Sequence, residues 1–428
     1  MLKGSGVATY GINLNSSLQG IGVATHLLYG PEQGLLKEPL VNEMRLFDAA
    51  KPTRSRFAEV ARQLKGLGPP RRRRAQSVSS SGAIVTRQIA RRAPPCAALW
   101  ASADLFHGAN RAFAAWGRFT PLAFDESERP GPSVMHWTYV LPLRAERRPN
   151  LYTIHDLVPI RLPYTTLDNK RRYYELCQQI CASADRIVTV SERSKQDIVD
   201  IFKVDESRVA VTYQAVDLPR SLLERPDAEV IGEVEGMFGL GWKNYFLFFG
   251  AIEPKKNLAR VIEAYLGSGV TTPLVVIGGK TWLDDDQTAL MYDDLVEVSV
   301  VRDGVIRRAD RVRLYDYLPF GLLVSLIRGA KATLFPSLYE GFGLPVLESM
   351  MLGAPVLTST EGSLPEIAGD AALIVDPYDV QAIRRGVVAL DRDADLRAEL
   401  VRRGVEQAAK FSLQAYQARL AELYRPFG

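Results

Sequence analysis

The chain has 428 residues, which is too long for one ordinary domain and predicts two domains of about 200 residues each. Hydrophobic residues make up 47% of it and charged residues 24%, the ordinary values of a soluble globular protein, and the formal net charge is only +4. No run of about 18 apolar residues occurs and the first residues lack a signal-peptide pattern, so we expect no membrane-spanning helix and a cytoplasmic location. The odd number of cysteines, three, argues against a disulfide framework.

Basic residues concentrate in residues 51–92, where Arg71, Arg72, Arg73 and Arg74 follow two prolines and precede a serine-rich stretch. This composition predicts a loop. Three interpretations stay open: a solvated loop, a patch that meets anionic lipid or a phosphate-bearing acceptor, and a nucleic-acid contact. The last is the weakest, because no aromatic residues are interleaved for base stacking. We therefore expect no nucleic-acid partner, and we keep a peripheral contact with the inner face of an anionic membrane as an alternative.

The chain begins with a glycine-rich stretch, residues 4–11, which predicts the turn that follows the first strand of a nucleotide-type domain, with a helix after it. No apolar strand precedes this stretch, so either the start was assigned late or the first strand is lost. A central parallel strand cannot be removed without exposing the backbone groups of its neighbours. Two later runs predict a short strand at 103–107, ending in His107, and a segment at 133–137 that leads into a turn at 141–143.

An apolar strand that starts at residue 150 runs directly into His155 and Asp156. Ligands of open α/β sheets bind at the carboxyl ends of the strands, which makes His155 a candidate site residue, although a lone histidine is more often structural. A helix at 165–184 follows, in which Cys177 and Cys181 lie one turn apart. With no histidine nearby, we expect these cysteines to be small core residues rather than metal ligands.

The remaining elements follow in order. The first domain ends with a strand at 186–190, a helix that Ser191 caps and that runs to residue 202, and a last strand at 209–217. Residues 218–241, rich in proline, glycine and acidic residues, predict an interdomain linker. The second domain is expected to contain strands at 245–250, 273–280 and 312–317, a helix at 321–329, and a helical segment at 391–424 with Leu396, Leu400, Val405, Ala408 and Phe411 as core candidates.

Residues 332–376 are the most informative stretch, with apolar runs that predict buried parallel strands at 332–335, 355–357 and 372–375. Between the first two strands, a loop with two glycines leads into a helix that Pro345 can open and Gly353 can close. The glycines allow a ligand to approach the backbone closely, and the helix turns unpaired N–H groups toward it. The sequence therefore predicts an anion site.

Glu340 and Glu348 flank this loop eight residues apart. We expect Glu340 at the carboxyl end of the strand and Glu348 in the first helical turn, both facing one crevice. A carboxylate beside two vicinal hydroxyls can hold a ribose or hexose ring while the loop holds the phosphates. The alternative for Glu348 is that it only complements the helix dipole. Lys255 and Lys256, at the turn after strand 245–250, can meet a diphosphate across the crevice, or they can simply be solvated.

Residues 340–348, with the sequence EGFGLPVLE, resemble the paired-glutamate motif of retaining GT-B glycosyltransferases of family 4. The resemblance continues through residues 353–356 and 364–372. It implies an α/β fold of the GT-B class, with two facing Rossmann-like domains, parallel sheets and a C-terminal helix that crosses back to the first domain. The implied parts are an acceptor-binding domain at 1–217 that contains the basic loop, a linker at 218–241, a donor-binding domain at 242–410 and the crossover helix at 411–428.

The resemblance implies a hexosyltransferase, with mannose as the best guess, that acts on a nucleotide diphosphate sugar and a glycan or lipid-linked acceptor. GDP-mannose is the expected donor and UDP-glucose the runner-up. The implied catalytic residues are His155, Lys256 and Glu340; the implied donor-binding residues are Gly250, Lys255, Lys256, Glu340, Gly341, Phe342, Gly343, Leu344 and Glu348. In the family an arginine often stands at the place of Lys255. A lysine there can contact the phosphates only as a point charge and not through a bidentate pair of hydrogen bonds.

The family also implies that no cofactor or metal is required, so Asp284, Asp285 and Asp286 are expected to form a solvated loop or a helix start rather than a metal site. Retention without a protein nucleophile implies front-face attack, in which the leaving phosphate helps to deprotonate the acceptor. The alternative from another functional class is a catalytically silent subunit that binds a nucleotide sugar and scaffolds a glycan pathway.

Overall fold

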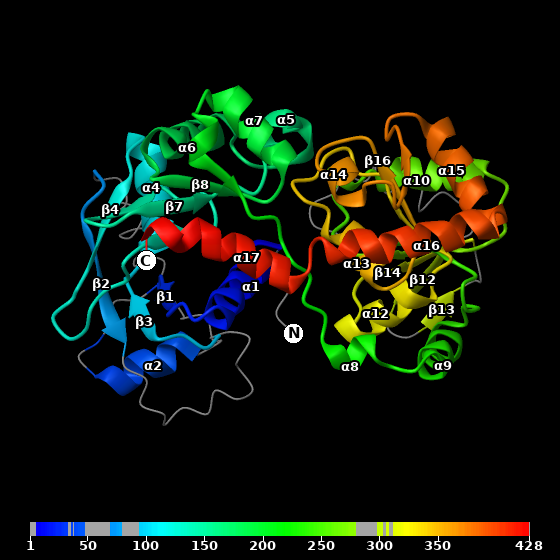
Figure 1. The fold of residues 1–428 in the computed structure, drawn as a ribbon, viewed down its shortest axis with the longest axis horizontal. Helices are drawn as coiled ribbons and strands as arrows, with labels where there is room; N and C mark the ends of the chain where they lie inside the picture. Colours follow the sequence, from blue (N-terminus) through cyan, green and yellow to red (C-terminus); the bar gives the residue numbers. More distant parts are fainter. Residues whose placement is uncertain are drawn as a thin grey trace.

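The computed structural model describes residues 6–32, 36, 38–47, 69–78, 94–279, 298–302, 305–307 and 311–427. The chain forms two α/β domains that lie beside each other (Figure 1). The last helix, α17 (Leu413–Tyr424), leaves the second domain and packs on α1 (Gly6–Gly20) of the first domain. The C-terminal helix therefore crosses back between the domains, as the sequence predicts.

The second domain is built on one sheet with the order β13-β12-β14-β11-β10-β15-β16-β17, in which all neighbours are parallel except β12 and β13. Four of its strands, β10, β11, β15 and β16, are buried along their whole length, as expected for parallel strands covered on both faces. The strands are β10 (Phe246–Phe249), β11 (Leu274–Ile277), β12 (Val298–Arg302), β13 (Val305–Arg307), β14 (Val312–Tyr315), β15 (Ala332–Phe335), β16 (Val356–Ser359) and β17 (Leu373–Val375).

Alternate residues of β10 face opposite sides of this sheet, because successive side chains of a strand point in opposite directions. Phe246 and Phe248 pack with α10 and α15, whereas Leu247 and Phe249 pack with α9 and α12. The helices are α8 (Arg220–Leu223), α9 (Asp227–Phe238), α10 (Leu258–Gly267), α12 (Phe320–Gly329), α13 (Leu344–Met351), α14 (Leu364–Ala368), α15 (Val380–Arg392) and α16 (Ala394–Ala409), with a 3₁₀ turn η3 (Pro254–Lys256). Much of the segment predicted as a linker is thus helical, and α9 packs on the second domain.

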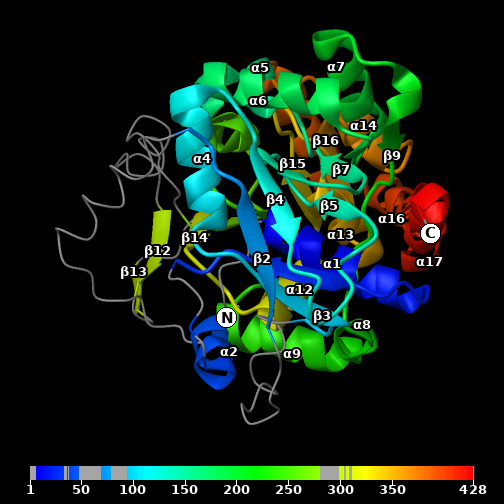
Figure 2. The same ribbon diagram turned by 90° about the vertical axis from the view of Figure 1, so that its left-hand side faces the viewer.

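The first domain contains two sheets. The order of one is β1-β3-β2-β4-β6, with β2 and β3 antiparallel, and the order of the other is β5-β7-β8-β9, which is entirely parallel. Figure 2 shows β2 beside β4 on the outer side of this domain. The strands are β1 (His26–Tyr29), β2 (Arg73–Val78), β3 (Ala98–Ala101), β4 (Thr120–Phe124), β5 (Met135–Trp137), β6 (Leu143–Ala145), β7 (Asn150–Thr153), β8 (Arg186–Thr189) and β9 (Val209–Val211).

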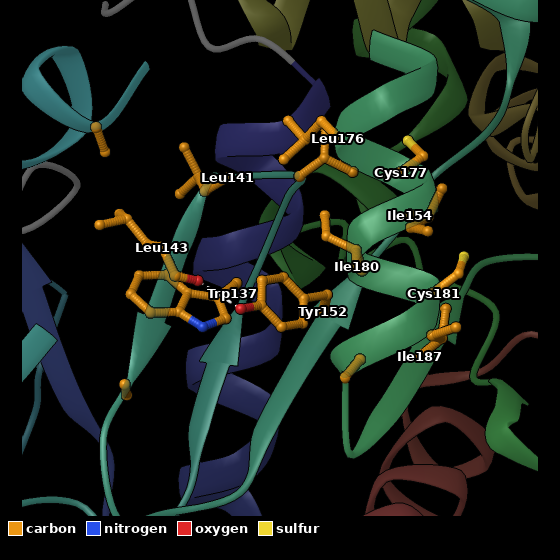
Figure 3. Packing of buried hydrophobic residues seen from close by; sticks show 14 of the residues in the cluster. Trp137, Leu141, Leu143, Tyr152, Ile154, Leu176, Cys177, Ile180, Cys181 and Ile187 are labelled. Atoms are coloured by element: carbon orange, nitrogen blue, oxygen red, sulfur yellow. Dashed lines mark hydrogen bonds between the residues drawn. The ribbon is translucent and has the colours of Figure 1, made fainter. Parts of the chain in front are cut away.

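The core of the first domain lies between its strands and helix α6 (Lys170–Ser183). Cys177 and Cys181 point from α6 into this core beside Ile180, near Tyr152 and Ile187 (Figure 3). Both thiols are free and buried, so the expectation that they are small core residues is confirmed. The other helical elements of this domain are α2 (Pro39–Phe47), α4 (Leu105–Trp116), α5 (Val158–Arg161), α7 (Glu192–Phe202), η1 (Pro163–Thr165) and η2 (Glu206–Arg208), and η4 (Arg425–Phe427) ends the described chain.

Some local predictions are wrong. Residues 6–11 belong to helix α1 rather than to a turn, and the strand expected at 103–107 is the start of α4, which places His107 on a helix. Leu105, Ala109 and Phe113 are buried at helical spacing, a pattern that a short window around Leu105 does not contain. In the second domain, Val405 is 56% exposed on α16 and is not a core residue.

The arginine run is also partly misassigned. Arg73 and Arg74 begin strand β2, so the loop prediction fails for residues 73–78. Arg72 pairs with Glu146 at 2.6 Å and Arg74 with Asp125 at 3.4 Å, which leaves less free positive charge than the sequence indicates. The rest of the basic segment, residues 51–68 and 79–92, and the aspartate run at 284–286 lie outside the described residues. No helix in the described part of the chain is long and apolar enough to cross a membrane.

Candidate active site

The predicted loop between β15 and α13 is present, and we refer to residues 338–343 as the glycine loop. Gly343 adopts φ 106° and caps α13, and Pro345 lies in its first turn. The helix begins at Leu344, so Glu348 is its fifth residue. The prediction that Glu348 lies in the first turn is wrong, and a role limited to the helix dipole, which falls off within that turn, is correspondingly weakened.

Glu340 is buried and meets both lysines of the turn η3. Its carboxylate lies 2.5 Å from Lys256 Nζ and 3.9 Å from Lys255 Nζ. Lys256 Nζ also lies 4.5 Å from the centre of the Phe335 ring, which adds a cation–π contact. Burial would raise the pKa of Glu340, but the two ammonium groups outweigh this effect and the net pKa lies below its ordinary value. Glu340 is therefore an ionised carboxylate at neutral pH.

The pKa of Glu348 is shifted in the opposite direction, upward. Burial raises its pKa from 4.5 to about 7, although Lys256 acts to lower it. The two acidic groups of the motif thus share one neighbouring cation but differ in protonation near neutral pH. Environments that separate the pKa values of neighbouring acidic groups are typical of functional sites.

The turn that carries the lysines is held firmly against the glycine loop. Asn257 adopts φ 63° and donates from Nδ2 to the Pro336 carbonyl at 3.0 Å, and the Leu338 N–H donates to the Lys255 carbonyl at 2.7 Å. Burial would lower the pKa of Lys255, but Glu340 and other nearby carboxylates raise it above its ordinary value. Both lysines are consequently preorganised cations beside Glu340.

His155 follows β7, as predicted. Its Nε2 lies 2.9 Å from the Thr138 carbonyl, to which it donates, and the edge of the Tyr10 ring packs on it at 4.6 Å between ring centres. Burial lowers the pKa of His155 despite the opposing effects of Thr138 and Asp156, so the imidazole is neutral. Its ring orientation is thereby fixed by residues of the first domain.

The two domains meet where His155 approaches the glycine loop. A Cβ atom added at Gly341 would lie 2.7 Å from the His155 carbonyl oxygen and 2.7 Å from Asp156 Cβ. Such distances leave no room for a side chain, so this contact requires glycine at position 341. The structure therefore places the backbone of His155 and Asp156 directly against the glycine loop of the second domain.

The remaining predicted residues differ in where their side chains point. Phe342 packs against Tyr213 and Phe411, with ring centres 6.4 and 5.8 Å away, and Leu344 packs on the same hydrophobic cluster. The Phe342 side chain is therefore buried away from a ligand, whereas Leu344 is only partly buried. Gly250 ends β10 with φ 128°, and its carbonyl oxygen occupies the place that a Cβ atom of Gly278 would need.

Sequence reasoning missed several polar contacts around the glycine loop. Ser191 caps α7 by accepting from the Ser194 N–H at 3.0 Å, as predicted, but its hydroxyl also donates to the Gly341 carbonyl at 2.7 Å. In addition, Tyr339 donates to Asp197 of the same helix. The spacing of Ser191, Ser194 and Asp197, three residues apart, places them on one helix face and is the only sequence signal for this contact.

Models of two glycosyltransferase families match the chain. Glycosyltransferase Family 4 matches residues 4–220, and Glycosyl transferases group 1 matches residues 240–407. Together the two matches span most of both domains, including His155 in the first and the glycine loop in the second.

Single glycosyltransferases are also similar to this chain. The O-antigen chain mannosyltransferase B of Escherichia coli is 32% identical over 292 residues, which is 67% of this chain and 72% of that protein. The serotype-specific mannosyltransferase WbdA of Escherichia coli is 28% identical over 64% of this chain, but the match spans only 33% of that longer protein. The structure of Anabaena HepE in complex with UDP-glucose superposes with a TM-score of 0.61 over 99% of this chain and 97% of HepE, at 15% identity.

Proposed function

The chain belongs to glycosyltransferase family 4 and has the GT-B fold, and we propose that it is a retaining, metal-independent mannosyltransferase that uses a nucleotide diphosphate sugar. The single observation that carries this proposal is the arrangement around Glu340. This carboxylate is paired with Lys256 in a buried site, and it lies in the glycine loop, which contacts the His155 segment of the facing domain.

The donor is proposed to bind between the lysine turn and the N-terminus of α13. The N–H groups at the start of a helix and of a glycine-rich loop favour phosphate and sugar oxygens. We assign Glu348 to the ribose hydroxyls and Glu340 to the hydroxyls of the donor sugar. Lys256, with Lys255 beside it, would then share its charge between Glu340 and the diphosphate.

Catalysis is proposed to depend on Lys256, because it can stabilise the negative charge that grows on the leaving diphosphate in the transition state. The neutral imidazole of His155, held by Thr138, would contact the donor sugar without adding charge near the reacting carbon. The leaving phosphate would accept the proton of the attacking hydroxyl on the same face of the sugar, which retains the configuration. The two lysines would supply the positive charge that phosphate departure requires.

The choice of mannose rests on the relatives named as mannosyltransferases, and we propose GDP-mannose as donor with UDP-glucose as the alternative. For the same reason we propose that the acceptor is a glycan chain of the O-antigen type, carried on a lipid or free.

A radiochemical transfer assay tests this function. The purified chain is incubated with labelled GDP-mannose or UDP-glucose, octyl α-D-mannoside as acceptor, and either Mg²⁺ or EDTA. We expect label to move from GDP-mannose to the acceptor equally well in EDTA, and the rate to fall at least about a hundredfold in Glu340→Gln. Equal transfer by wild type and Glu340→Gln, or strict dependence on Mg²⁺, would contradict the proposal.

A further inference from the structure

Helix α7 of the first domain contacts the glycine loop of the second domain at several points, and Figure 1 shows α5 and α7 on the side of the first domain that faces α14. The first point is Asp197, whose side chain is completely buried. One of its oxygens accepts from Arg161 of the same domain, and the other accepts from the hydroxyl of Tyr339 in the glycine loop. Tyr339 is the residue immediately before Glu340.

The second point lies on the other side of Glu340. The hydroxyls of Ser191 and Ser194 lie 2.7 and 3.3 Å from the Gly341 carbonyl oxygen. Ser194 Oγ also lies 3.2 Å from the carbonyl oxygen of His155. Both serines are buried, so these bonds form away from solvent. The backbone on each side of Glu340 is thus held by the same helix of the opposite domain.

The third point is the N-terminus of α7. The carboxylate of Glu366, from α14 of the second domain, accepts from the backbone N–H groups of Glu192 and Arg193 at 2.9 and 3.2 Å. The first N–H groups of a helix have no partner within the helix, and a carboxylate is favourable there. The Glu366 carboxylate of the second domain therefore caps the N-terminus of α7 in the first domain.

A small apolar cluster supports these polar bonds. Val158 and Leu162, at α5 and directly after it, pack against Leu338 and Tyr339 of the glycine loop, and all four are buried. The Tyr339 ring belongs to this cluster while its hydroxyl reaches Asp197. The hydroxyl also accepts from Arg193 Nε at 3.4 Å, so replacing only the hydroxyl removes two polar bonds to α7 and leaves the apolar contact.

Separation of the domains would not strand a buried charge in the first domain. Asp197 would keep Arg161, and Arg193 also lies 3.5 Å from it. Ser191 would still accept from the Ser194 N–H. Because each α7 side chain of this contact has a second partner within its own domain, and the N–H groups at the helix start can turn to water, the interdomain bonds can break and re-form at modest cost.

We propose that Asp197 is a positioning residue of the transferase: through Tyr339 it fixes the backbone that carries Glu340 only when the two domains are closed. We call Ser191, Ser194 and Asp197 with their partners Gly341, Tyr339 and Glu366 the α7–loop contact. This inference rests on the proposed function, because it assigns Glu340 to the donor sugar. It couples assembly of the donor site to domain closure, which also excludes water from the reacting centre.

The experiment compares Tyr339→Phe and Asp197→Asn with two matched controls. Tyr174→Phe removes a hydroxyl from a 37% exposed tyrosine on α6, and Asp200→Asn neutralises an exposed aspartate one turn further along α7. Four quantities are measured: the radius of gyration of the ligand-free chain by small-angle X-ray scattering, kcat for mannosyl transfer, the ratio of donor hydrolysis to transfer, and the Kd for GDP by calorimetry.

In both test variants we expect a larger radius of gyration, a kcat lower by about ten- to a hundredfold and a higher ratio of hydrolysis to transfer, with the Kd for GDP within about twofold of wild type. The double variant should be no worse than Asp197→Asn alone, because the Tyr339 hydroxyl donates to Asp197, whereas Asp197→Asn also weakens the pair with Arg161. The controls should match wild type in all four quantities.

Unchanged scattering, kcat and hydrolysis ratio in both test variants would overturn the inference. A loss of GDP binding in proportion to the loss of kcat would also overturn it, because that result indicates damage to the donor site rather than to closure. Failure of the proposed function gives a different pattern: the wild type then transfers no sugar, while the scattering difference between wild type and variants still reports whether the α7–loop contact closes the domains.

Discussion

Lys256 is the residue on which both acidic groups of the site depend. It lies 2.5 Å from the Glu340 carboxylate and also lowers the pKa of Glu348, although burial dominates there. Its own position is set by the turn η3 and by Asn257, whose side chain donates a hydrogen bond to the Pro336 carbonyl directly after β15. One cation therefore acts on both glutamates of the proposed donor site.

Removal of this cation should affect stability and turnover together. In Lys256→Ala, Glu340 remains as a buried carboxylate with only Lys255 nearby, so we expect a loss of about 2 kcal/mol in the free energy of unfolding, measured in urea. The transfer rate should fall by about two orders of magnitude, because charge on the leaving diphosphate is no longer balanced.

Glu340→Gln in the same background provides the control. The double variant should regain most of the lost stability, since no unpaired carboxylate remains, and it should stay inactive. A double variant as unstable as Lys256→Ala would show that the ion pair is not the cause.

Glu348 should make stability depend on pH. Its pKa is raised from 4.5 to about 7 in the folded chain, so the folded state binds the proton more tightly than the unfolded state. The resulting stabilisation is complete below about pH 4.5 and is lost as the pH rises through 7. Relative to Glu348→Gln, wild type should lose on the order of 2 kcal/mol between pH 5 and 8.

Chemical denaturation of both proteins at several pH values measures this difference. A stability difference that is constant across the range would contradict the raised pKa. If Glu348 binds the ribose as a carboxylate, the KM for the donor should also fall as the pH rises through 7, and Glu348→Gln should lack that change.

Single residues were predictable where they belong to short motifs that directly follow strands. Glu340, Gly341 and Lys256 follow strands, and strand ends of a parallel sheet meet at one edge, which is why the sequence could place them together. The pair of Tyr339 and Asp197 was not predictable, because its members are 142 residues apart and neither lies in a pattern that selects the other. The protonation of Glu348 also depends on burial that only the folded chain defines.

At the scale of elements, α17 connects the domains. Tyr416 and Leu420 of this helix are buried, and they join a cluster that contains Tyr10 of α1 as well as Phe342 and Val346 of the donor side. His136 of β5 adds a polar bond, 2.5 Å from the Tyr424 hydroxyl. The last helix therefore belongs to a hydrophobic cluster that joins the two domains, and its loss should destabilise the contact between them.

Leu420→Ala tests this element. Deleting a buried leucine side chain should cost about 2 to 5 kcal/mol and should lower the melting temperature of the whole chain. Val405→Ala is the control, because Val405 is exposed on the preceding helix and its change should stay within about 0.5 kcal/mol. Differential scanning calorimetry of wild type and both variants measures the change in melting temperature. A Leu420→Ala chain that melts like wild type would contradict the packing of α17.

Elements were predictable from the sequence where their apolar runs are long or their caps are clear. Strands β10, β11, β14, β15, β16 and β17 and the capped helix α7 were placed correctly, whereas β12 and β13 were not predicted. The start of α4 was not, because a short apolar run before it fits strand and helix equally well. The position of Glu348 was wrong because α13 begins at Leu344, and helix boundaries shift by a residue or two with the local cap.

At the scale of the whole molecule, the proposed site lies where the domains meet. The first domain supplies His155 and helix α7, and the second supplies the glycine loop and both lysines. The GT-B fold was predictable from motif resemblance, but the contacts across the interface were not, because they depend on how two separate cores face each other. The proposed function therefore requires both domains rather than either one.

The most direct test of this account is the anomeric configuration of the first product, observed by NMR during transfer from GDP-α-D-mannose to octyl α-D-mannoside in EDTA. Retaining transfer without metal predicts an α-mannosyl product from the first turnovers onward, formed by wild type and not by Glu340→Gln. A β-mannosyl product, or an α-product that appears only when Mg²⁺ is restored, would contradict the proposed roles of Glu340 and Lys256.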